Sequence, residues 1–262
     1  MIVSHSRQFI FLHIPKNAGK SIESILVPST SEIDFLTDKH IYGSIIEQRQ
    51  SNKSYRRINR GLINPWGPGH HSGIKDLQRA RPWRYIRTPL GTVRDPIQRL
   101  HARLFPVYRE SQQIIERYFT FAFVRNPWDR MVSIYHFFHQ GGEVSAQQRT
   151  EFADFRSWLN NDDMIINPYF GPEIQRVLKT TPQAEWMKDE NGTIAVDFIG
   201  RVERIDEDIQ KLQEKIGLPR QSPPKMNPSN HSDYREYYDD ETIDIVGKLF
   251  MDDIRLWNYT FK

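Results

Sequence analysis

Three short apolar segments limit the folds open to this chain more than any other feature of its sequence. They are residues 9–14 (FIFLHI), 119–124 (FTFAFV) and 194–199 (IAVDFI). Their length and their content of aromatic and β-branched residues are typical of buried strands. Since such nearly continuous apolar strands occur mainly in parallel sheets covered on both faces, we expect a central parallel sheet.

Helical patterns lie between and after these segments. Apolar residues follow helical spacing within 131–138, 205–216 and 243–257, and Pro127 is suited to the first position of the earliest of these helices. The alternation of strands and helices predicts an α/β fold in which helices flank the sheet. The length of 262 residues fits a single domain spanning residues 1–262.

Composition narrows the class of protein. The chain has no cysteine, which excludes disulfides, thiolate metal ligands and a cysteine nucleophile. No apolar run approaches the ~18 residues of a membrane span, and the N-terminal MIVSHSRQ lacks the apolar core of a signal peptide. We therefore expect a soluble, cytoplasmic protein without a membrane span.

Charge is distributed unevenly along the chain. The formal net charge is +3, but residues 53–118 carry 14 Lys and Arg against four Asp and Glu, a balance of +10. Such segregation indicates either a surface that binds an anion or a plain solvated surface. Nucleic acid is not the expected partner, because the chain has no helix-turn-helix, zinc or aromatic RNA-binding signature. This basic region has little periodicity, so we expect irregular structure there.

The segment HIPKNAGKS directly follows the first expected strand and precedes residues that can form a helix. A strand, a tight turn and a helix N-terminus make an anion-binding site, because backbone N–H groups converge there. Lys16 and Lys20 add positive charge, and Ser21 adds a hydroxyl. The turn is not a complete nucleotide-binding P-loop, since Ile14 stands five residues before its glycine, where that motif has Gly. An ordinary turn with exposed lysines is the alternative.

A second motif, FAFVRNPWDRMVS, begins at Phe121. Arg125 lies at the end of an expected strand, where its planar guanidinium can bind a phosphate, and Ser133 can donate a further hydrogen bond from the following helix. In the alternative interpretation, Arg125 forms an ion pair with Asp129, and Ser133 packs against a neighbour. A similar heptapeptide contains Arg94, a competing phosphate site, but no serine lies eight residues after it.

Together and in this order, the two motifs resemble those of the sulfotransferases that use 3′-phosphoadenosine-5′-phosphosulfate (PAPS). The closest likeness is to the carbohydrate-acting Golgi branch and its bacterial relatives. It continues in residues 199–208, 227–238 and 253–259, whereas residues 28–118 match poorly. The resemblance implies transfer of a sulfuryl group from PAPS to a hydroxyl acceptor, with a carbohydrate as the expected acceptor and adenosine 3′,5′-bisphosphate (PAP) as product.

The resemblance also implies roles for individual residues. The turn would hold the 5′-phosphosulfate, with Lys16 also acting in catalysis, through Lys16, Asn17, Ala18, Gly19, Lys20 and Ser21. Arg125 and Ser133 would hold the 3′-phosphate, which distinguishes PAPS from ATP. The family commonly has Thr where this chain has Asn17 and Lys20, and we expect donor binding to survive both differences. No metal is expected, because Lys and Arg can stabilise the leaving phosphate.

On the acceptor side, the reaction needs a general base, which contributes about 10²–10⁴ in rate. His70 and His71 follow Gly69 and resemble the Gly-His element that carries the base in some carbohydrate sulfotransferases. His70 fits that element and His71 is its neighbour; a structural or metal-binding histidine pair is the alternative. His13 is expected to be buried at the sheet edge, and the histidines of the helix after Pro127 are expected to pack.

Two other functions remain open on the sequence alone. A kinase or another P-loop NTPase would use the same turn, but the chain lacks a clear acidic strand end to hold its metal. A non-catalytic module that binds polyanions would use the basic region, but it leaves the two phosphate motifs at strand ends unexplained.

Overall fold

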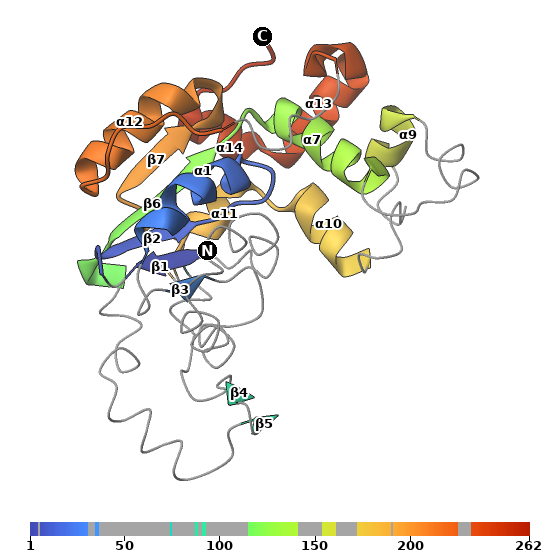
Figure 1. The fold of residues 1–262 in the computed structure, drawn as a ribbon. Helices are drawn as coiled ribbons and strands as arrows, with labels where there is room; N and C mark the ends of the chain where they lie inside the picture. The colour runs from blue at the N-terminus through green and yellow to red at the C-terminus, as the bar shows by residue number, and fades with distance from the viewer. Residues whose placement is uncertain are drawn as a thin grey trace. The chain divides into compact units, whose positions relative to one another are not determined.

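A computed structural model describes residues 1–4, 6–30, 35–36, 74, 87–88, 91–92, 115–140, 154–160, 172–189, 191–224 and 232–262 (Figure 1). The chain forms two compact units. We call the first the sheet unit; it comprises Met1–Ile14, Ala18–Phe123 and Trp186–Pro224. The second, the helical unit, comprises Pro15–Asn17, Val124–Glu185 and Lys225–Lys262. The prediction of a single domain stays a prediction.

The main sheet has five strands in the order β3-β1-β2-β6-β7. Their bounds are β1 Ile2–Ser4, β2 Phe9–Leu12, β3 Phe35–Leu36, β6 Phe119–Val124 and β7 Phe198–Arg201. A second, antiparallel pair consists of β4 (Arg87–Thr88) and β5 (Gly91–Thr92).

The expectation of a parallel sheet is confirmed in part. Strands β2 and β6 are parallel, with Phe11 opposite Phe121, whereas β1 pairs antiparallel with both β2 and β3. The reason is the length of the connections. Only four residues join β1 to β2, and parallel strands need a crossover of about a dozen residues or more. The protein is therefore a mixed α/β structure.

The apolar segments match the strands to different degrees. Strand β6 has the expected bounds, β2 ends two residues early, and β7 begins at Phe198 instead of Ile194. Ile194 instead forms an isolated antiparallel bridge with Lys188. Pairing with β6 starts at Asp197, whose backbone N–H donates to the Thr120 carbonyl at 2.8 Å. Strand β1 was not predicted, because three residues are too few to show a periodicity.

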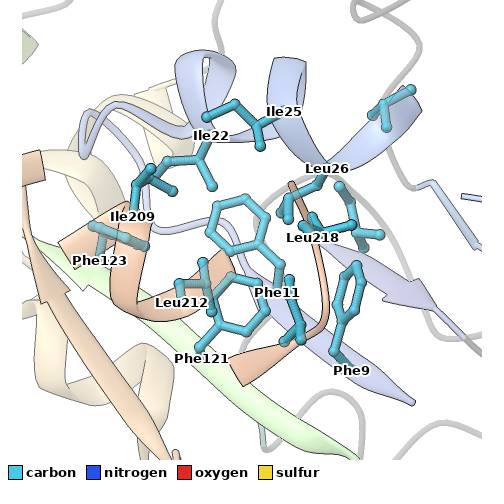
Figure 2. Packing of buried hydrophobic residues seen from close by; sticks show 13 residues of the cluster. Phe9, Phe11, Ile22, Ile25, Leu26, Phe121, Phe123, Ile209, Leu212 and Leu218 are labelled. Atoms are coloured by element: carbon cyan, nitrogen blue, oxygen red, sulfur yellow. The ribbon is translucent and has the colours of Figure 1, made fainter. Parts of the chain in front are cut away.

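The core of the sheet unit lies between the sheet and the helices α1 (Gly19–Leu26) and α12 (Ile205–Lys215), as Figure 2 shows. Phe11 and Phe121, from neighbouring strands, stack with ring centroids 5.3 Å apart. Ile22 of α1 and Leu212 of α12 pack against this aromatic layer and are fully buried. The turn between β2 and α1 therefore joins two elements of one packed core. Short 3₁₀ segments follow α1 at Val27–Ser29 and precede α12 at Val202–Arg204.

The helical unit contains most of the other helices. They are α7 (Pro127–Gln140), α9 (Phe155–Asn160), α10 (Pro172–Thr180), α11 (Gln183–Met187), α13 (Asp240–Leu249) and α14 (Met251–Trp257), with a 3₁₀ turn at Tyr234–Tyr237. Helix α7 begins at Pro127, as predicted. The apolar pattern of 243–257 is not one helix, because the backbone at Phe250 (φ −116°, ψ 30°) ends α13 before α14 begins. Within the described residues, no helix combines the length and apolar character needed to cross a bilayer.

Candidate functional site

The turn between β2 and α1 has an unusual backbone. Lys16 and Ala18 have positive φ values, 67° and 56°, and Asn17 between them does not. Alternation of this kind directs successive N–H groups to one side and creates a concavity that can bind an anion. Helix α1 starts at Gly19, so its N-terminal N–H groups and dipole add to the same attraction.

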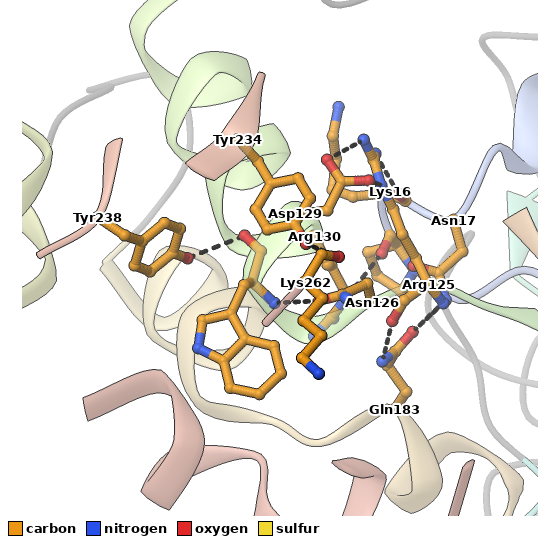
Figure 3. A network of polar contacts seen from close by, with 12 residues as sticks. Lys16, Asn17, Arg125, Asn126, Asp129, Arg130, Gln183, Tyr234, Tyr238 and Lys262 are labelled. Carbon is orange, nitrogen blue, oxygen red and sulfur yellow. Dashed lines mark hydrogen bonds and ion pairs between the residues drawn. The ribbon is translucent and has the colours of Figure 1, made fainter. Parts of the chain in front are cut away.

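Positive φ is unfavourable for Lys and Ala, so the surroundings must hold this turn in place. Residues 15–17, at the start of this turn, are held by the side chains of Arg125, Arg130 and Gln183 (Figure 3). Arg130 Nε donates to the carbonyl of Pro15 at 3.1 Å, and Arg125 Nη1 donates to the carbonyl of Lys16 at 3.2 Å. Asn17 Nδ2 donates to Gln183 Oε1 at 2.7 Å. Each of the three consecutive residues is thereby fixed.

Gln183 is a residue that the sequence analysis missed. Its side-chain amide pairs with the backbone of Arg125: Arg125 N donates to Oε1 at 2.9 Å, and Nε2 donates to the Arg125 carbonyl at 2.9 Å. The same Oε1 accepts the hydrogen bond from Asn17. Gln183 therefore ties the end of β6 to the turn. No local pattern marks this glutamine, because both partners lie far away in the sequence.

Asp253 holds Gln183 in place and was missed as well. Its carboxylate accepts hydrogen bonds from the backbone N–H groups of Gln183 (2.7 Å) and Ala184 (2.9 Å), the first two residues of α11. Asp253 is fully buried, and burial raises the pKa of its carboxyl group, although these hydrogen bonds act in the opposite direction. In sequence, Asp253 looks the same as its exposed neighbour Asp252.

Arg125 lies where the sequence places it, directly after β6, and it forms the ion pair considered as the alternative. Its Nε and Nη2 contact the two carboxylate oxygens of Asp129 at 2.7 and 2.8 Å. With the bond to the Lys16 carbonyl, three of its five N–H donors are used. Among the described residues, no hydrogen bond is recorded for the other two. Ser133 lies two turns along α7 and is buried.

Arg130 is a buried cation behind the turn. Its relative exposure is 1%, and burial lowers its pKa to about 10, against the opposing effect of Asp253. It is therefore still charged at neutral pH. Its Nη2 has no hydrogen-bond partner among the described residues. A charged guanidinium bonded to the Pro15 carbonyl makes the potential around the turn more positive.

The remaining predicted turn residues differ in exposure. Lys20 is exposed, whereas Ser21 is buried. The ammonium of Lys16 lies 4.6 Å from the ring centroid of Phe137, on α7. Lys16 is thus placed by a cation–π contact on its side chain as well as by the hydrogen bond to its carbonyl.

The acceptor-side prediction falls on undescribed parts of the chain. His70, His71 and the competing Arg94 all lie outside the described residues. The packing role expected for the histidines of α7 is confirmed: His136 Nε2 lies 2.8 Å from the hydroxyl of Tyr237, and the His139 ring contacts an aromatic neighbour. Within the described ranges, no cluster of three or more His, Asp or Glu could hold a metal ion.

Comparison with known proteins identifies the family. Residues 1–260 match the model of the sulfotransferase family. The chain belongs to the sulfotransferase family. Two curated relatives also match this sulfotransferase-family chain. An uncharacterised protein of Archaeoglobus fulgidus is 27% identical over 128 residues, which is 49% of this chain and 92% of the relative. Carbohydrate sulfotransferase 14 of Danio rerio is 32% identical over 124 residues.

The second match is partial. It covers 42% of this chain and 33% of the zebrafish protein, so the chain spans only about a third of that relative's length. No solved structure gives a significant match.

Proposed function

We propose that this sulfotransferase-family protein transfers a sulfuryl group from PAPS to a hydroxyl group of a carbohydrate. The observation that carries the proposal is the turn at residues 16–18. The sign of φ alternates along it, as in anion-binding turns, and Arg125 donates directly to the carbonyl of Lys16.

The residues present fit the donor, which carries two separate anionic groups. Backbone N–H groups from Lys16 to Ser21, with the side chains of Lys16 and Lys20, would bind the 5′-phosphosulfate. Asn17 would contribute its backbone N–H, since one of the two side-chain N–H donors is bonded to Gln183. The two remaining N–H donors of Arg125, with Ser133, would bind the 3′-phosphate.

The chemistry divides between the donor and the chain. PAPS supplies an activated sulfuryl group whose departure leaves negative charge on a phosphate. Lys16 would stabilise that charge as it develops, and the pre-formed turn would do so without reorganising. On the acceptor side, a base would remove the proton of the attacking hydroxyl. We assign this role to His70, with His71 as the second candidate.

The choice of a carbohydrate rests on the name of the zebrafish relative and on the charge of this chain. The basic region of residues 53–118 would suit an anionic saccharide. Turnover on sulfatable saccharides should fall about 10²–10⁴-fold in His70→Ala, with donor binding unchanged. Near-normal turnover in both His70→Ala and His71→Ala would show that the base lies elsewhere.

Calorimetric binding of PAP tests the donor assignment. PAP should bind and stabilise the protein at concentrations at which 5′-AMP does not, by about 2.7 kcal/mol at 100 times its dissociation constant. Arg125→Ala should weaken PAP binding by about tenfold or more, since a hydrogen bond to a charged group contributes ~1.5–3 kcal/mol. Arg94→Ala is the matched control and should bind PAP nearly normally.

Two results would contradict this assignment. Equal stabilisation by PAP and 5′-AMP would remove the 3′-phosphate site. Stronger stabilisation by ATP with Mg²⁺ than by PAP would favour a nucleotide-hydrolysing or phosphoryl-transferring enzyme.

A further inference from the structure

A buried pair of titratable side chains lies behind the turn, within the sheet unit. His13 follows β2 and Glu23 lies on α1; their relative exposures are 5% and 1%. His13 Nδ1 is 2.8 Å from Glu23 Oε1. The other carboxylate oxygen, Oε2, has no hydrogen-bond partner among the described residues. Burial of a carboxyl group with one free oxygen is costly, and the proposed mechanism so far gives this pair no role.

The face of the imidazole ring at Nε2 lies against the backbone of the turn. A Cβ atom added at Gly19 would lie 2.0 Å from His13 Nε2 and 2.3 Å from both Cδ2 and Cε1. The ring therefore fills the space beside Gly19, the first residue of α1. His13 contacts the Glu23 carboxylate through Nδ1 and Gly19 through its ring face, so this one imidazole touches both the carboxylate and the turn.

Three charged or titratable groups act on Glu23: His13 from the end of β2, Lys20 from α1, and the amino group of Met1 beside β1. Burial raises the pKa of Glu23 to about 7, against the opposing effects of the Met1 amino group and Lys20. Because His13 and Glu23 share a hydrogen bond, they titrate as a pair. Below the apparent pKa the pair is neutral overall, whichever residue carries the proton, and above it the pair has a charge of −1.

We propose, on the basis of the proposed function, that His13 and Glu23 act as one positioning unit behind the turn. This pair takes up a proton when the turn binds the anionic donor. The physical reason is repulsion. A buried negative charge hydrogen-bonded to the imidazole that contacts the turn opposes a bound anion, and the low dielectric of the interior strengthens that effect. Thermodynamic linkage is reciprocal: if loss of the proton from the pair weakens donor binding, bound donor must favour the protonated pair.

The test compares PAP affinity in the wild type and in Glu23→Gln by calorimetry from pH 6 to pH 8.5. Gln keeps the shape and the acceptor oxygen for His13 but cannot ionise. The two proteins should bind PAP equally at pH 6. At pH 8 the variant should bind up to about tenfold more tightly, because the wild type must first take up a proton. Ionisation of PAP itself affects both proteins alike and cancels in the comparison.

The matched control is Glu207→Gln, the same change at an exposed position of α12. Its PAP affinity should follow the wild-type curve at every pH. A second measurement covers the case in which Glu23→Gln does not fold. Wild-type calorimetry at pH 7.5 in buffers of different ionisation enthalpy should show net proton uptake on PAP binding.

The outcomes separate this inference from the proposed function. Parallel pH curves for the wild type and Glu23→Gln, or no proton uptake by the wild type, would overturn the inference alone. Failure of the wild type to bind PAP at any pH would overturn the proposed function and this inference with it.

Discussion

At Gly19 the imidazole of His13 occupies the space that a side chain would need. Gly19→Ala should therefore destabilise the protein by about 1–3 kcal/mol, the usual cost of forcing extra atoms into a packed site. It should also weaken PAP binding, because the shift falls on the first residue of α1. Urea unfolding measures the first effect and calorimetry the second.

Gly247 provides the matched control for this substitution. It lies within α13, and an added Cβ would meet its nearest neighbour, Trp128, at 3.8 Å, an ordinary contact. Gly247→Ala should leave stability unchanged or raise it by about 0.5–1 kcal/mol, since Ala favours helix more than Gly does. A similar loss in both variants would show that the position of His13 is not what makes Gly19 sensitive.

At the level of elements, the first turn of α11 depends on a residue from α14. Asp253→Asn would lose the charge that accepts the N–H groups of Gln183 and Ala184 and that balances buried Arg130. We expect a loss of about 1–3 kcal/mol in the free energy of unfolding, the usual cost of leaving buried hydrogen-bonding groups without a partner. Chemical denaturation measures it.

The same substitution should weaken PAP binding, because Gln183 connects Asn17 to Arg125. Asp252→Asn is the control: Asp252 is exposed on the same helix, and its substitution should change stability by less than about 0.5 kcal/mol. If both variants unfolded at the same denaturant concentration, Asp253 would not have the role that its hydrogen bonds indicate.

At the level of the whole molecule, the chain passes five times between the sheet unit and the helical unit, after residues 14, 17, 123, 185 and 224. Independent domains are usually joined by exposed, flexible linkers. Here two of the boundaries between the units fall inside regular elements, one within β6 and one within α11. We therefore expect one cooperative unfolding transition in scanning calorimetry, with equal calorimetric and van't Hoff enthalpies. Two separate transitions would contradict the prediction of a single domain.

Local pattern was enough to predict several elements of this protein. Strand β6, helix α12 and the start of α7 at Pro127 agree with the sequence, because an apolar period and a helix-starting proline act over neighbouring residues. The turn and Arg125 could be found for the same reason. Their residues are close in sequence, and the family motif is a short, contiguous one.

Tertiary structure alone decided the rest. The antiparallel edge of the sheet depends on which strands meet, and the partners of Gln183 lie 58 residues or more away along the chain. Only the folded chain shows that Arg125 is bound to Asp129 as well as to the turn. Hydrogen bonds and burial depend on distances in space, which residue order does not specify until packing has brought the segments together. The sequence by itself thus determined the family and the motif, and the tertiary structure decided which side chains hold that motif in place.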